Sequence, residues 1–123
     1  MIITSENNAE YLLIRSVAKL KNEDDLIKHA MLVYEEYKKY SNKKVVLDGL
    51  ETEFPLDLFP YYDLVQFYIE KFPPEVREIR LACVISPEYT RIGKFWETAS
   101  GNRGFQYRAF ISLREAEEWL MEE

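Results

Sequence analysis

The chain has 123 residues, of which 47% are hydrophobic and 31% are charged. This length and composition predict one globular domain, spanning residues 1–123, with a hydrophobic core of its own. The net charge of −6 disfavours binding to nucleic-acid phosphates and to anionic membrane surfaces.

The single cysteine, Cys83, excludes an intramolecular disulfide and fits a reducing compartment. The first 13 residues contain acids and amides where a signal peptide needs an apolar core. No apolar run approaches the length of a membrane span. We therefore expect a cytoplasmic protein without membrane insertion.

The first forty residues predict a β-hairpin followed by an amphipathic helix. Strands are expected near residues 2–5 and 10–18, with a turn at Asn7-Asn8, because asparagine tolerates positive φ. Asn22 can cap a helix over residues 26–40, and the three acids after it suit the positive end of the helix dipole. The expected apolar face of this helix contains Leu26, Ile27, Ala30, Met31, Val33, Tyr34 and Tyr37.

The rest of the chain alternates between strands and helices. Strands are expected near residues 45–48, 79–86 and 105–111, and the first of them ends at a turn signal, Asp48-Gly49. Helices are expected to begin at Pro60, at Ser86-Pro87 and at Ser112, because proline suits a first helical turn and serine caps helix starts. This alternation predicts an α/β fold with a single mixed, mostly parallel sheet, an N-terminal antiparallel hairpin and flanking helices.

Four segments carry a resemblance to a known family. They are the early hairpin, the VVLDG strand end at 45–49, the strand-Ser-Pro-helix unit at 79–99 and the ending GFQYRAFISLREAEEWL at 104–120. Together they resemble the STAS fold of bacterial anti-sigma-factor antagonists, and they look closest to small stand-alone STAS-like proteins, sometimes grouped with lipid-binding Sec14-like domains. The resemblance covers nearly the whole chain and implies, by analogy, a regulatory protein-interaction role.

One departure from that family concerns phosphorylation. In the antagonists, the strand that ends in an aspartate leads to a loop with a phosphorylatable serine. The corresponding residues 49–62 here contain no serine, and their only hydroxyl besides the tyrosines belongs to Thr52. Glu51 and Glu53 flank Thr52 and would repel a phosphate. We therefore predict that the loop after Asp48 carries no phosphorylation switch.

Two single residues are candidates for chemistry and have simpler interpretations. His29, the only histidine, falls outside the expected apolar face of its helix, which favours a solvated surface residue over a metal ligand. Cys83 lies within the apolar segment LACVI, which favours an inert core thiol over a nucleophile. We expect neither a metal nor a cofactor.

A polar candidate site lies around the expected end of the 45–48 strand. Open α/β sheets place ligands at the carboxyl ends of their strands, and carboxylates there can serve acid-base work or hold Mg²⁺. A solvated acidic loop explains the same residues more simply, and Ser86 is also explained as a helix cap. The members of this set are Asp48, Glu51, Glu53, Asp57 and Ser86.

The most informative segment is the connector, residues 50–62, which is too apolar for an ordinary solvated loop. Its prolines, Pro55 and Pro60, stiffen it and lower the entropy cost of any contact. A rigid apolar surface rimmed by acids suits an interface with a second copy or another protein, and the same side chains suit the lid of a ligand pocket. They are Leu50, Phe54, Leu56, Leu58, Phe59, Tyr61 and Tyr62.

Three functions therefore stay open at the level of the sequence. The favoured hypothesis is a non-catalytic regulatory or protein-interaction domain of STAS type that lacks the phosphorylatable serine and forms a homodimer. The alternative is a binding protein or sensor for a small apolar ligand. The third is an enzyme that uses the carboxylates near Asp48.

Overall fold

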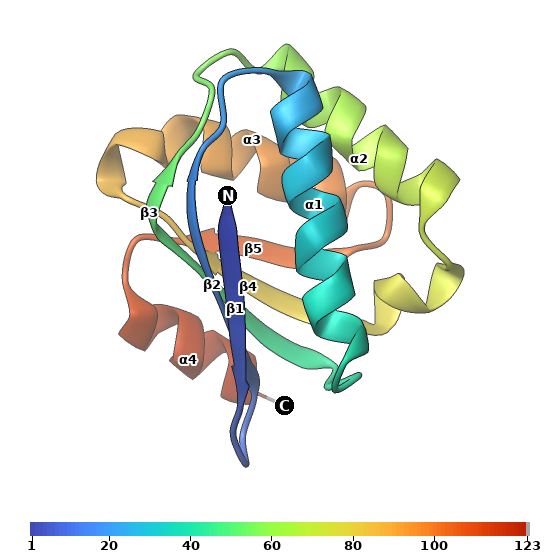
Figure 1. The fold of residues 1–123 in the computed structure, drawn as a ribbon, viewed down its shortest axis with the longest axis vertical. Helices are drawn as coiled ribbons and strands as arrows, with labels where there is room; N and C mark the ends of the chain where they lie inside the picture. Colours follow the sequence, from blue (N-terminus) through green and yellow to red (C-terminus); the bar gives the residue numbers. More distant parts are fainter. Residues whose placement is uncertain (123) are drawn as a thin grey trace.

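The computed structural model describes residues 1–122, which form one five-stranded sheet flanked by four α-helices (Figure 1). The order of strands and helices along the chain is the predicted one, ββαβαβαβα, with two short 3-10 helices added. The strands are β1 (Ile2–Asn7), β2 (Leu12–Lys19), β3 (Lys44–Glu53), β4 (Arg80–Val84) and β5 (Gln106–Phe110). The helices are α1 (Glu23–Lys38), α2 (Phe59–Lys71), α3 (Thr90–Gly101) and α4 (Leu113–Met121).

The sheet has the strand order β1-β2-β3-β4-β5. The β1–β2 hairpin is antiparallel, and every other neighbouring pair is parallel. This confirms the predicted mixed sheet with its antiparallel edge. The hairpin turn uses Asn8, whose side-chain oxygen accepts hydrogen bonds from the backbone of Glu10 and Tyr11.

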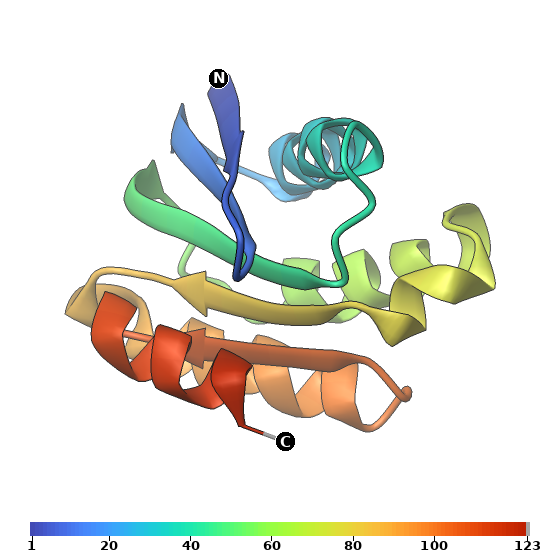
Figure 2. The same ribbon diagram turned by 90° about the horizontal axis from the view of Figure 1, so that it is seen from below.

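The helices cover the two faces of the sheet unequally. Helices α1, α2 and α3 lie on one face, and α4 covers β3, β4 and β5 on the other (Figure 2). Helix α2 packs chiefly against α1 and α3 rather than against the strands. Helix α2 is therefore held away from the strands, and the candidate site lies between α2 and the sheet.

Local signals set the ends of three helices as predicted. The Asn22 side chain accepts a hydrogen bond from the backbone N–H of Asp25 at 3.0 Å, and the Ser112 hydroxyl accepts one from the backbone N–H of Glu115 at 3.3 Å. Pro60 lies in the first turn of α2. The expected cap at Ser86 is wrong: a 3-10 helix, Pro87–Tyr89, precedes α3, and the Ser86 hydroxyl donates to the Leu50 carbonyl at 3.4 Å.

The predicted turn at Asp48-Gly49 is also wrong, because β3 continues to Glu53. The pairing with β2 shifts from Arg15–Asp48 to Val17–Glu51, so a β-bulge lies between them. Glycine suits this place because a Cβ on Gly49 would lie 3.1 Å from the Val84 carbonyl oxygen. The bulge reverses the alternation of side chains, so Thr52 faces the same side of the sheet as Leu47.

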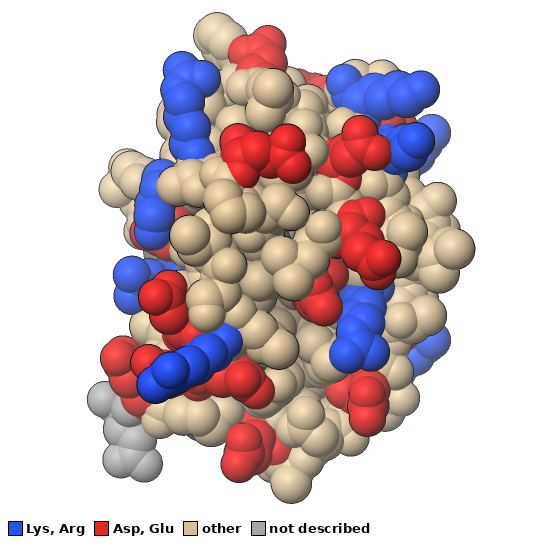
Figure 3. All heavy atoms as spheres, turned by 90° about the vertical axis from the view of Figure 1, so that its left-hand side faces the viewer, with Lys and Arg blue, Asp and Glu red and all other residues tan. Residues whose placement is uncertain are grey.

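Charged side chains of both signs are spread over the described surface. On the face drawn in Figure 3, acids and bases are interspersed rather than gathered into a patch of one sign. No helix within residues 1–122 combines the length and apolar character needed to cross a membrane.

Candidate functional site

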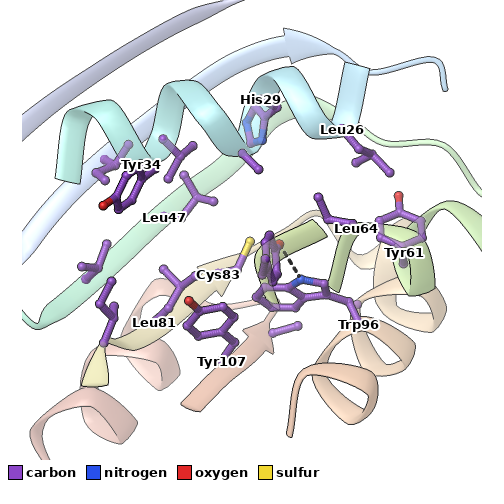
Figure 4. Close-up of a pocket in the computed structure, with 18 of the residues that line it drawn as sticks. Leu26, His29, Tyr34, Leu47, Tyr61, Leu64, Leu81, Cys83, Trp96 and Tyr107 are labelled. Carbon is purple, nitrogen blue, oxygen red and sulfur yellow. Dashed lines mark hydrogen bonds between the residues drawn. The ribbon is translucent and has the colours of Figure 1, made fainter. Parts of the chain in front are cut away.

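The candidate site is an apolar cavity of about 120 Å³ between α1, α2, α3 and the strands β3, β4 and β5. Figure 4 shows side chains from these elements converging on it, with Leu47 and Leu81 from the sheet and Leu64 from α2. Protein interiors rarely contain voids larger than a water molecule, so this cavity is a departure from ordinary core packing.

The periodicity of each element explains why these side chains meet. Helix α1 presents one face at helical spacing, and alternate residues of the strands point toward that face. The cavity lining from α1 comprises Leu26, His29, Ala30, Val33, Tyr34 and Tyr37, and that from the three strands comprises Val45, Leu47, Leu81, Cys83, Tyr107 and Ala109.

Three aromatic side chains form a wall with satisfied polar atoms. Trp96 donates its indole N–H to the Tyr68 hydroxyl at 3.1 Å and stacks on Tyr107, with ring centres 5.9 Å apart. The Tyr107 hydroxyl donates to the Val76 carbonyl at 3.2 Å. Burial raises the pKa of both tyrosines, so this wall is neutral.

His29 lies in the cavity wall, and the expectation of a solvated surface histidine is wrong. Its side chain is 94% buried, and Nε2 lies 2.6 Å from the Ser16 hydroxyl. That hydroxyl lies 2.6 Å from the Thr52 hydroxyl, which donates to the Ser16 carbonyl at 2.9 Å. Ser16 and Thr52 are each 2% exposed, so this chain of hydrogen bonds is wholly internal.

Burial, with a smaller contribution from the positively charged amino terminus, lowers the pKa of His29 to about 4. The imidazole is therefore neutral at physiological pH. The proximity of Ser16 and His29 does not form a nucleophile-base pair, because a substrate cannot reach the buried Ser16 hydroxyl. The Thr52 hydroxyl is likewise buried within the folded domain.

The helix pattern alone assigned His29 and Met31 to the wrong sides of α1. His29 follows Leu26 by three residues and precedes Val33 by four, so it belongs to the packed face, whereas Met31 is half exposed. The partners that stabilise a buried histidine lie on β2 and β3. The bulge that brings Thr52 to this side has no clear signal in the sequence.

Cys83 is buried in β4, as predicted for a core thiol, and it also lines the cavity. Burial, with a smaller contribution from the nearby Asp48, raises its pKa to about 12. The thiol is therefore protonated at physiological pH, which is unfavourable for a nucleophile.

The connector divides into an inward and an outward set. Phe54 and Tyr61 line the cavity, and Leu58 packs against the core. The Tyr61 hydroxyl donates to the Pro55 carbonyl at 2.6 Å and holds the connector to the start of α2. The outward set, which is exposed, comprises Leu50, Leu56, Phe59 and Tyr62.

The polar candidate residues do not converge on one point. Asp48 pairs with Arg15 across the strands at 3.6 Å and lies within β3, not at its carboxyl end as expected. Glu53 pairs with Lys19 at 3.9 Å, and Glu51 and Asp57 are exposed. Within residues 1–122, no three His, Cys, Asp or Glu side chains lie close enough to hold a metal ion.

Sequence reasoning missed most of the cavity wall. Tyr37, Tyr68, Trp96 and Tyr107 come from four separate elements, and no motif links them. The high aromatic content, 15% of the chain, was the one signal of an unusual interior or surface. Because the wall is neutral and mostly apolar, its chemistry suits binding rather than catalysis.

Comparisons with known proteins identify the fold. No protein-family model matches the chain, and no curated protein is significantly similar to it in sequence. A crystal structure of an uncharacterized protein of the DUF3478 family from Shewanella loihica PV-4, described as having a SpoIIAA-like fold, matches with a TM-score of 0.52. The two are 19% identical, over 97% of this chain and 92% of that chain. The chain therefore has the SpoIIAA-like fold, which is the STAS fold that its sequence resembles.

Proposed function

We propose that this STAS-like domain binds a small apolar molecule in the cavity between α1, α2, α3 and the sheet. The observation that carries the proposal is the cavity itself, whose wall combines aliphatic and aromatic side chains with tyrosines and a histidine that are neutral. Apolar pockets with a few polar groups are the usual form of small-molecule sites.

The volume limits the size of the molecule. An engineered cavity of about 150 Å³ in another protein binds benzene, so about 120 Å³ accommodates one ring or a short alkyl chain. A larger ligand requires α1 and α2 to move apart. Helix α2 is well placed for such movement because it packs chiefly against its neighbouring helices.

The inward part of the connector supports this proposal. Phe54 closes one side of the cavity, with its ring edge-on to Tyr89 at 5.3 Å and to His29 at 6.4 Å between ring centres. The stiff connector therefore serves as a wall of the ligand site. This contact supports the interpretation of the connector as the lid of a ligand pocket.

Filling the cavity should abolish binding of a small apolar probe. Toluene at ten times its dissociation constant should stabilise the wild type by about 1.4 kcal/mol, or about 4–6 °C in melting temperature. The double variant Leu47→Phe/Leu64→Phe should lose this shift, because both side chains point into the cavity. Differential scanning calorimetry measures both quantities.

Leu13→Phe is the matched control, because Leu13 packs on the opposite face of the sheet. It should keep the toluene shift of the wild type. A wild type whose melting temperature does not respond to toluene, or a filled double variant that responds as the wild type does, would contradict the proposed function.

The second candidate function is the one that the sequence favours, a regulatory STAS-type domain that acts by self-association. The supporting observation is the outward set of the connector, in which Phe59 is 77% exposed and Leu56 is 63% exposed. A cluster of large exposed apolar residues is typical of protein interfaces. We propose a second copy of the chain as the partner, as the predicted homodimer requires.

Phe59→Asp should weaken self-association at least tenfold without a large change in melting temperature, because this side chain is mostly exposed. Sedimentation equilibrium over a range of protein concentrations measures the association constant. Met31→Asp, at an exposed apolar residue on α1, is the control and should leave association unchanged. A strictly monomeric wild type at high concentration would exclude this second function.

A further inference from the structure

One residue of the cavity wall carries a buried polar atom without a hydrogen-bond partner of ordinary length. Tyr37 lines the cavity from the last turn of α1, and the residue is 93% buried. Its hydroxyl is shielded from solvent and makes no hydrogen bond to residues 1–122. A buried hydroxyl without a partner is costly and is uncommon in folded proteins, so it requires an explanation.

The surroundings of this hydroxyl are polar and positively charged on one side. Lys43 places its ammonium 5.8 Å from the Tyr37 ring centre. Its polar interaction with the Tyr37 hydroxyl is the main cause that raises the pKa of that lysine, although the two groups are too far apart for a hydrogen bond of ordinary length. Lys43 also lies 3.9 Å from the Glu78 carboxylate, but both side chains are exposed, so this pair is weak. The ammonium is therefore available to an anion near Tyr37.

Three other polar side chains of the wall already have partners. His29 bonds to Ser16, Tyr61 donates to the Pro55 carbonyl, and Tyr107 donates to the Val76 carbonyl. A phenolic hydroxyl without a partner is a ready donor, so a ligand that completes the site supplies an acceptor oxygen. The positive charge of Lys43 favours an acceptor that is an anion.

We propose, on the basis of the proposed function, that the ligand is a small monocarboxylate with an apolar body. Its carboxylate accepts a hydrogen bond from the Tyr37 hydroxyl on the side of the cavity near Lys43. Its ring or short alkyl chain lies against Trp96 and Tyr107. A volume of about 120 Å³ suits an aromatic acid or a short-chain fatty acid better than a long-chain lipid.

Benzoate and toluene are the two probes that test this inference, because they share a ring and differ in the carboxylate. Isothermal titration calorimetry should show that Tyr37→Phe weakens benzoate binding about tenfold or more and leaves toluene binding within twofold of the wild type. Lys43→Met should weaken benzoate several-fold and leave toluene unchanged. Tyr40→Phe, at an exposed tyrosine one turn further on, is the control and should change neither.

The melting temperature gives an independent readout. Tyr37→Phe should melt at the same temperature as the wild type or higher, because it removes an unpartnered buried hydroxyl. A marked fall would show that the hydroxyl already has a protein partner and would contradict the inference. Lys43→Met tests separately whether a positive charge attracts the carboxylate of the ligand, since Lys43 is exposed and its replacement leaves the core intact.

The outcomes separate this inference from the proposed function. If toluene binds the wild type but benzoate does not, or if benzoate binds wild type and Tyr37→Phe equally, the carboxylate inference is wrong and the cavity function stands. If neither probe binds the wild type, both the inference and the proposed function fail.

Discussion

Replacing Trp96 with alanine should lower the free energy of unfolding by about 3–5 kcal/mol, the usual cost of deleting a buried aromatic side chain. Trp96 is buried, stacks on Tyr107 and donates its indole N–H to Tyr68. Its removal leaves the Tyr68 hydroxyl without that partner and enlarges the cavity. Urea unfolding followed by circular dichroism measures the change.

Two variants make this result specific. Trp96→Phe keeps an aromatic ring and loses only the indole N–H and part of the volume, so it should cost less than Trp96→Ala. Trp119→Ala removes a half-buried tryptophan on the opposite face of the sheet and should also cost less. The enlarged cavity of Trp96→Ala should admit naphthalene, which is too large for the wild type. Equal costs for Trp96→Ala and Trp119→Ala would contradict the assigned role of Trp96.

Lowering the pH should destabilise the protein through His29. The folded state lowers the pKa of His29 from its ordinary value of 6.5 to about 4. Between these two values the unfolded chain binds a proton that the folded protein does not, so stability falls as the pH falls. The loss approaches about 3 kcal/mol by pH 4, because each pKa unit corresponds to about 1.4 kcal/mol.

Carboxylates also titrate in this range, so the test compares the wild type with a variant that lacks the imidazole. His29→Gln cannot titrate, and its free energy of unfolding should fall less than that of the wild type between pH 7 and pH 4, by about 2–3 kcal/mol. Urea unfolding at several pH values gives both curves. Parallel curves for the two proteins would mean that His29 is not held neutral in the folded state.

Much of the fold follows from local rules that can be applied to the sequence. Asn22 and Ser112 cap their helices with their own side chains. The hairpin turn lies at residues 8–11, one residue later than predicted and without a positive φ at either asparagine, and it is held by the side chain of Asn8 beside it. The alternation of strands with helices then predicts the parallel part of the sheet. These features depend on neighbours in the chain, so the sequence alone is sufficient for them.

The features that were predicted wrongly depend on partners that are distant in the chain. Gly49 follows an aspartate and gives a strong turn signal, but its place in β3 depends on its close approach to Val84 and on a bulge against β2. His29 is buried because Ser16 and Thr52 supply a hydrogen-bonded partner on two other elements. Neither contact leaves a pattern within its own segment.

The candidate site was predicted only in part, for the same reason. Phe54 and Tyr61 were among the proposed lid residues, and both line the cavity. The rest of the wall requires the relative positions of α1, α2 and the sheet, which set how far α2 lies from the strands. A void is a property of packing between elements, and no segment of the sequence encodes it by itself.

The most direct test of the central claim is the position of a bound apolar probe. Intermolecular nuclear Overhauser effects between toluene and the methyl groups of the protein should appear at Leu47 and Leu64, which face each other across the cavity. This result would place the ligand between the sheet and α2. Contacts confined to Leu50 and Leu56, on the exposed side of the connector, would contradict the account and assign toluene binding to the surface.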